Sequence, residues 1–163
     1  MGEMHIERRL EEMGLELPEP IKLPEGMRLP FQWVRVRGNR ACISGHGPLL
    51  PDGTIAGPFG KVGDEVTVKQ AYVSARLTAL NMLASLKREL GDLDRETAWL
   101  RVFGMVNTVP GLTQQPAAIN GFSDLILELY GPEAGQHVRS VVGMADLPRG
   151  LPGEIEAEVE IAD

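Results

Sequence analysis

The side chains that most often carry chemistry are few and widely separated in this chain. Three histidines, His5, His46 and His137, stand far apart, and no two have the i, i+4 spacing that brings two ligands to one metal on a helix. Cys42 is the one cysteine, so neither an internal disulfide nor a cysteine-based zinc site can form. We therefore expect no metal site.

Carboxylates form the most regular pattern in the sequence. Near the C-terminus, four glutamates alternate strictly with four apolar residues, in the order Glu154, Ile155, Glu156, Ala157, Glu158, Val159, Glu160 and Ile161. A period of two predicts a strand with one apolar face and one acidic face. An acidic face of this kind can orient water for a reaction, and it can equally be a solvated or subunit-contacting surface.

Length and composition indicate one globular domain. The chain has 163 residues, of which 43% are hydrophobic and 24% charged, enough to bury a single core. The net charge is −7, whereas nucleic-acid-binding domains usually present a basic face to phosphates. Nucleic acid is therefore a disfavoured partner.

The N-terminal segment is charged throughout and lacks the apolar stretch of a secretory signal, and no apolar run in the chain is long enough to cross a membrane. We expect a cytoplasmic protein that does not enter a membrane. Residues 1–28 are predicted to form an N-terminal arm, with a short helix over 3–13 followed by an extended proline-rich stretch. Residues 29–163 are predicted to form a single domain.

Two long helices are predicted. Thr67 and Gln70 form a capping-box pair at the start of a helix over 67–90, whose apolar residues recur at intervals of three or four. A second helix is predicted over 116–130 and should end at Gly131.

Five segments are predicted to be strands: 31–37, 40–45, 97–107, 138–145 and 154–161. The first two flank a Gly38-Asn39 turn and should form a hairpin, in which Cys42 would be a small core residue. In 97–107, simple alternation puts Val102 on one face and Trp99 on the other, and both faces are largely apolar. The glycine- and proline-rich stretch 46–63 is predicted to be a loop.

The predicted order is thus β-β-α-β-α-β-β, which indicates an α+β fold with two long helices on one face of a mixed sheet. Two helices cannot cover both faces of a five-stranded sheet. The other face would be left partly apolar in a monomer, and such a surface is typical of a subunit interface.

Three segments resemble the YjgF/YER057c/UK114 family, also called the RidA family. Residues 139–162, RSVVGMADLPRGLPGEIEAEVEIA, resemble its C-terminal signature of an arginine, a Leu-Pro turn and a glutamate-alternating strand. Residues 37–49 resemble its Gly-Asn hairpin, and residues 119–131 resemble its helix with an asparagine near the start and an end rich in aromatic and acidic residues. The resemblance covers about residues 30–162 and suggests a longer branch of the family.

The resemblance implies a chorismate-mutase-like α+β fold and a homotrimer with active sites in the clefts between subunits. It also implies hydrolysis of reactive enamine or imine intermediates, such as 2-aminoacrylate, to 2-keto acids and ammonia. The partners would be small 2-imino and 2-keto carboxylates, and no metal or organic cofactor would be required.

The resemblance also assigns site residues. Arg139 would bind the substrate carboxylate, for which the paired N–H groups of a guanidinium are well suited, and Glu154 would position the attacking water. Asn120, Ser44 and Phe31 would line the cleft.

The sequence departs from the family pattern at three of its positions. Phe31 stands where many deaminases have a tyrosine, so any role of that hydroxyl is missing. Val141 replaces a common cysteine, and His46 replaces a common glutamine; the roles of His46 and His137 stay open.

Two other functions remain open at this point. The same trimeric clefts could bind a small carboxylate metabolite without catalysis. An endoribonuclease activity, also associated with the family as L-PSP, is disfavoured by the net charge of −7 and by the absence of a histidine pair or a lysine and arginine cluster.

Overall fold

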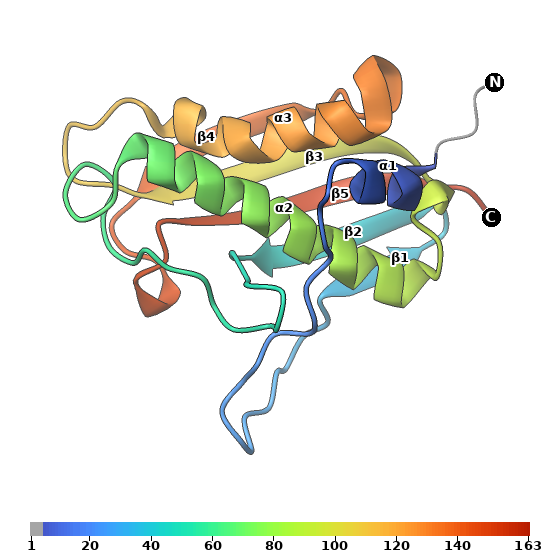
Figure 1. Cartoon of the computed structure of the whole chain (residues 1–163), viewed down its shortest axis with the longest axis horizontal. Helices are drawn as coiled ribbons and strands as arrows, with labels where there is room; N and C mark the ends of the chain where they lie inside the picture. The colour runs from blue at the N-terminus through green and yellow to red at the C-terminus, as the bar shows by residue number, and fades with distance from the viewer. Residues whose placement is uncertain (1–4) are drawn as a thin grey trace.

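The order of strands and long helices is the predicted one. The structure, a computed structural model, describes residues 5–163 (Figure 1). The elements are α1 (Ile6–Glu12), β1 (Val34–Arg37), β2 (Arg40–His46), α2 (Val68–Leu90), β3 (Glu96–Asn107), α3 (Gln115–Ala134), β4 (Val138–Met144) and β5 (Gly153–Ile161), with 3-10 turns at Leu93–Arg95 and Pro148–Gly150. None of the helices in this range is long and apolar enough to cross a membrane.

The five strands form one mixed sheet in the order β1-β2-β5-β3-β4. Only β3 and β4 pair in parallel, which is possible because α3 provides the long crossover that a parallel pair requires. The predicted alternation of β5 is confirmed: its apolar residues are buried and its glutamates are half-buried. In this strand order β5, the last strand of the sequence, lies in the middle of the sheet and pairs with both β2 and β3.

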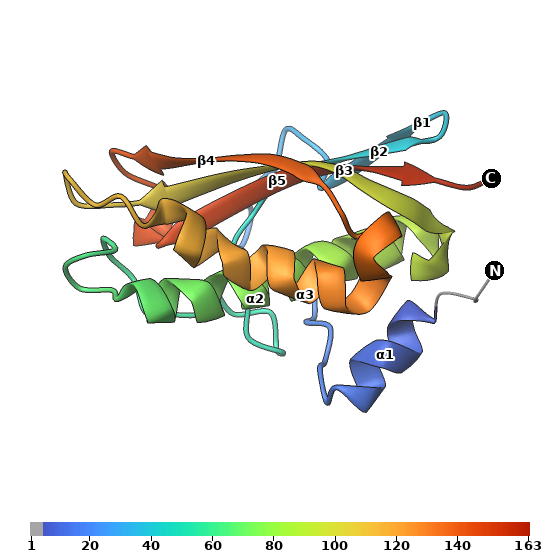
Figure 2. The ribbon, with the colours of Figure 1, turned by 90° about the horizontal axis from the view of Figure 1, so that it is seen from above.

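Helices α2 and α3 lie side by side on one face of the sheet and leave the other face bare (Figure 2). The capping box of α2 is confirmed, since Thr67 Oγ1 accepts from the Gln70 amide at 3.0 Å and Gln70 Oε1 accepts from the Thr67 amide at 2.9 Å. A Cβ on Gly121 of α3 would lie 1.9 Å from the carbonyl oxygen of Tyr72, so the two helices can approach this closely only at a glycine.

The simple alternation expected for β3 is wrong. The β3–β5 register shifts between Trp99 and Arg101, so Trp99 and Val102 both point to the helices. Trp99 is buried there with its ring 5.7 Å from those of Phe122 and Tyr130. The bare face of β3 is correspondingly less apolar than the sequence suggested.

Two boundaries and the burial of one residue also differ from those expected. Strand β1 begins at Val34, which leaves Phe31 outside the strand and half exposed. Gly131 does interrupt α3, with φ of 81°, but another helical turn follows it. Cys42 is exposed on the bare face, so the prediction of a core cysteine is wrong.

The N-terminal arm packs on the domain through α1. Ile6 and Leu10 are buried in the main core, and the Ile6 amide donates to Asp94 Oδ1 at 3.0 Å. These two residues keep the apolar spacing on which the helix prediction rested, and positions 3 and 4 of that predicted helix lie outside the described residues. Beyond α1, the chain runs away from the body of the protein, turns at positions 25–26 and returns to β1 (Figure 1).

A fully buried carboxyl at the start of β3 gives the fold a pH dependence. Burial raises the pKa of Glu96 to about 8, although the hydrogen bond from Tyr130 Oη to Glu96 Oε1, 2.8 Å long, opposes the rise. The folded state therefore keeps a proton that the unfolded state releases near pH 4.5. The stability that this proton contributes is complete below that pH and is lost as the pH rises through about 8.

We expect Glu96→Gln to remove this dependence, because glutamine keeps the acceptor for Tyr130 and does not titrate. The free energy of unfolding, measured in urea, should increase relative to wild type by about 1–3 kcal/mol between pH 5 and pH 8. The exposed acid Glu128 provides a control, since Glu128→Gln should show no such trend. A difference between Glu96→Gln and wild type that does not change with pH would contradict the buried, protonated carboxyl.

Candidate functional site

Arg139 lies in β4, the edge strand, and is oriented by α3. Its register partner in β3 is Val102, a fully buried residue beneath the helices, so the Arg139 side chain starts on the helix-covered face. Nη2 donates to Asn120 Oδ1 at 2.7 Å and Nη1 donates to Ser123 Oγ at 3.0 Å. The structure thus brings together Arg139 and Asn120, two residues that sequence analysis placed in one site.

A third side chain completes this network. His137 Nδ1 lies 2.8 Å from the Gly135 carbonyl oxygen, which can only accept, so Nδ1 carries the proton and Nε2 accepts from Ser123 Oγ at 2.9 Å. Burial lowers the pKa of His137, and the charge of Arg139 lowers it further. The imidazole is therefore neutral near pH 7, and the positive charge of the cluster belongs to Arg139.

The Arg139 charge has no acidic partner in the described chain. None of the ion pairs among residues 5–163 includes Arg139, and its two hydrogen-bond acceptors are neutral. A guanidinium has five N–H groups, so more than half of them are left for a ligand. This cation is held in place and is suited to an anion, above all a planar carboxylate.

Glu154 lies on the opposite face of the sheet. It pairs with Met105 of β3, whereas the next residue, Ile155, is buried in the core under the helices. Its carboxylate lies over Gly45 of β2, where a Cβ would come within 2.5 Å of Glu154 Oε2. Burial raises the pKa of Glu154, and the neighbouring Glu156 carboxylate raises it further.

Arg139 and Glu154 therefore cannot meet around one small substrate within a single chain, because the sheet separates them. Both lie at positions that another subunit could approach: Arg139 on the edge strand and Glu154 on the bare face. Any site that uses both must be completed by a second copy of the chain.

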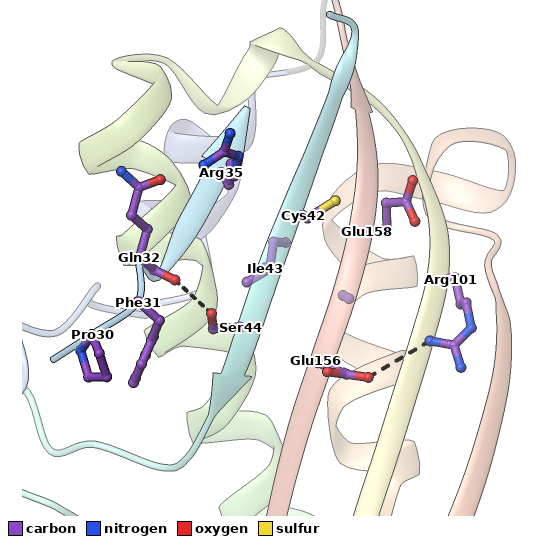
Figure 3. Close-up of a pocket in the computed structure, with 11 residues that line it drawn as sticks. Pro30, Phe31, Gln32, Arg35, Cys42, Ile43, Ser44, Arg101, Glu156 and Glu158 are labelled. Carbon is purple, nitrogen blue, oxygen red and sulfur yellow. Dashed lines mark hydrogen bonds and ion pairs between the residues drawn. The ribbon is translucent and has the colours of Figure 1, made fainter. Parts of the chain in front are cut away.

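Phe31 and Ser44 line a broad cavity on the bare face (Figure 3). Its volume is about 690 Å³, and Arg101 and Glu156, whose charged atoms lie 4.0 Å apart, form part of its wall. Ser44 Oγ donates to the Gln32 carbonyl oxygen at 2.6 Å, which fixes the hydroxyl to the backbone. Ser44 and Phe31 are thus close to one another but on the Glu154 side of the sheet, away from Asn120 and Arg139.

A smaller cavity of about 240 Å³ contains Glu154 and also borders Phe31. It lies where the N-terminal arm passes the end of β2. Phe31 thus lines both the charged cavity and the one that holds Glu154.

Sequence analysis missed Ser123 and left His46 open. Ser123 comes one turn after Asn120 on α3, and this i, i+3 spacing beside a predicted site residue could have identified it. His46 is buried, with Nδ1 2.6 Å from the Ser44 carbonyl oxygen and Nε2 2.8 Å from Ser85 Oγ. Burial lowers the pKa of His46 to about 4, so it serves as a neutral link between β2 and α2. Within residues 5–163, no three histidine, cysteine or acidic side chains gather in a way that could hold a metal ion.

Fold and site together define an α+β protein with one bare sheet face and an arginine held in place at the sheet edge. The chain belongs to the YjgF/chorismate mutase-like family: the family model described as "YjgF/chorismate_mutase-like, putative endoribonuclease" matches residues 7–150. The resemblance seen in the sequence is confirmed, as is the fold that it implied. Members of this family are typically oligomeric.

Relatives share almost the whole chain. Protein TCP17 of Trypanosoma cruzi is 36% identical over 144 residues, which cover 86% of this chain and 88% of that protein. The crystal structure of Atu1372 from Agrobacterium tumefaciens, whose function is described as unknown, matches with a TM-score of 0.84, 39% identity and coverage of 96% of this chain and 91% of that one. A "putative endoribonuclease" from Shewanella oneidensis matches with a TM-score of 0.85, 32% identity and coverage of 96% and 99%.

Proposed function

We propose that the protein hydrolyses reactive 2-imino acids to 2-keto acids and ammonia in clefts between its subunits. Arg139 of one subunit binds the substrate carboxylate, and Glu154 of the neighbouring subunit positions the attacking water. Enamines such as 2-aminoacrylate enter the reaction after tautomerising to the imine. Asn120 acts through Arg139 by holding the guanidinium in place.

The reaction requires one group of the protein to transfer protons. The water oxygen bonds to the carbon of the protonated imine while Glu154 takes a proton from that water, and the glutamic acid then protonates the nitrogen. The carbon–nitrogen bond breaks, and the remaining hydroxyl proton leaves with ammonia as ammonium. One water is consumed, nothing is oxidised or reduced, and Glu154 returns to its starting state.

The main support for this proposal is that the positive charge of Arg139 has no acidic partner in the described part of the chain. A structural arginine at a sheet edge would be expected to pair with one of the many acids of a chain whose net charge is −7. Arg139 instead bonds only neutral groups among the described residues, which leaves its charge for a ligand. The raised pKa of Glu154 supports the proton-transfer role, because a base works best when its pKa approaches the working pH.

The assembly that we propose is a homotrimer in which the bare sheet faces meet. Val138 and Val142 of β4 are 70% and 39% exposed on that face. Exposed apolar side chains of this kind are typical of a surface that packs against another subunit. Light scattering at micromolar concentration should give three times the chain mass of 17.8 kDa. Val138→Asp should shift this mass toward the monomer, whereas Val73→Asp, on the outer surface of α2, should not. A monomeric wild-type protein would contradict the site between subunits.

A coupled assay tests the reaction itself. A pyridoxal-phosphate lyase generates 2-aminoacrylate from serine, and keto-acid release is followed with and without the protein. We expect release faster than the spontaneous hydrolysis. No acceleration, combined with tight binding of keto acids, would favour a non-catalytic carboxylate-binding module instead.

Ribonuclease activity has less support from this chain. The net charge of the chain is −7, which would repel a phosphate backbone. RNA cleavage that copurifies with the protein through ion exchange and disappears in Arg139→Ala would favour the endoribonuclease description over our proposal.

A further inference from the structure

The cavity that holds Glu154 is apolar on most of its surface. The N-terminal arm contributes Leu23 and Met27 to its wall, and Leu29 follows directly after the arm. Ile55 and Leu151 line the cavity from the loop after β2 and the turn before β5. The polar side chains of the wall belong to Asn81, Arg149 and Glu154. The neighbouring cavity on the bare face is more charged, since four of its eleven lining residues are arginines or glutamates.

The size of this cavity indicates which substrate side chains would fill it. At about 240 Å³, it has room for roughly eight groups the size of a water molecule. The methylene group of 2-aminoacrylate, or a methyl in its imine form, would fill a small part of it. A side chain of four to seven carbons would fill most of it and would bury its apolar surface against the arm.

We propose that this cavity is the side-chain pocket of the active site and that the preferred substrates are 2-imino acids with branched or aromatic side chains. The inference rests on the proposed function, because the cavity belongs to the active site only if Glu154 positions the attacking water. The carboxylate would lie toward the neighbouring Arg139, the imine carbon near Glu154, and the side chain among the apolar residues of the arm. The arm, which leaves the body of the protein between α1 and β1, is thus a specificity element (Figure 1).

Imines of different size test the preference. An amino-acid oxidase, with catalase present, produces the imines of alanine, leucine and phenylalanine, and keto-acid release is measured with and without the protein. Each buried methylene should contribute about fourfold, so kcat/KM for the leucine imine should exceed that for the alanine imine by on the order of 50-fold. Equal acceleration of all three would overturn this inference and leave the proposed function intact. Acceleration of none would overturn both.

A substitution in the cavity wall and a matched control locate the effect. Met27 is 47% exposed and lines the cavity, whereas Leu50 is 45% exposed and does not. Met27→Trp should fill the pocket and lower the ratio of kcat/KM for the leucine imine to that for the alanine imine at least tenfold, and Leu50→Trp should leave this ratio unchanged. Leu29→Trp repeats the test from a second position in case Met27→Trp disturbs the arm. Wild-type activity of both cavity variants on the leucine imine would overturn the assignment.

Discussion

Arg139→Lys is expected to lose kcat/KM for imine hydrolysis by about 10²-fold or more, although the charge is kept. A lysine ammonium is a single point and cannot present two parallel N–H groups to a carboxylate. It also cannot bond Asn120 and the ligand in the same planar arrangement that Arg139 uses. The measurement is the initial rate of keto-acid release from a freshly generated imine over a range of imine concentrations.

A matched control for this substitution is Arg76→Lys. Arg76 lies on α2 beside Glu128, at 3.9 Å, and has no part in the proposed site. It should keep wild-type kinetics, and light scattering should show the same mass for both variants. Wild-type activity of Arg139→Lys would show that Arg139 contributes no more than charge and would remove the carboxylate-binding role.

Glu154→Gln is expected to separate binding from turnover. Because Glu154 acts on water rather than on the carboxylate, keto acids should bind the variant about as well as wild type. Turnover should fall about 10²–10⁴-fold, the usual effect of removing a group that moves a proton in the reaction. The variant Glu160→Gln is the control, since Glu160 lies on the same face of the same strand but accepts from Thr97 Oγ1 at 2.7 Å.

The pH profile gives an independent readout for Glu154. Wild-type activity requires the ionised carboxylate, so it should fall as the pH falls through the raised pKa of this group, above the usual range for glutamate. The residual activity of Glu154→Gln should lack this decrease. If activity of the variant still falls at low pH as in wild type, that decrease belongs to another group. Full turnover by the variant would show that Glu154 has no catalytic role and is only one of the alternating glutamates of β5.

The features predicted correctly from sequence are those set by local chemistry. The capping box at Thr67 needs only residues three apart, and the alternation in β5 needs only the eight residues 154–161. Both are present in the structure. The turn at Gly38 likewise joins β1 and β2 as a hairpin, since glycine adopts the φ of 59° found there.

The features that were missed depend on partners distant in sequence. The side of the sheet that Trp99 faces is set by a register shift against β5, some sixty positions away, which no pattern within β3 contains. For the same reason, sequence analysis proposed Arg139 and Glu154 for one site without seeing that they start on opposite faces. Ser123 was missed because its role follows from the contact between α3 and β4.

The central claim is that one imine is hydrolysed by Arg139 and Glu154 of different subunits, and mixed assemblies test it most directly. Arg139→Ala and Glu154→Gln, each expected to have less than about one hundredth of wild-type activity alone, are unfolded together and refolded at equal concentrations. In a ring in which each site joins two neighbours, about one quarter of the sites would then contain both native residues. We predict that imine hydrolysis returns to about one quarter of the wild-type rate. Hybrids that form, as mass measurement can show, and yet stay inactive would contradict a site shared between subunits.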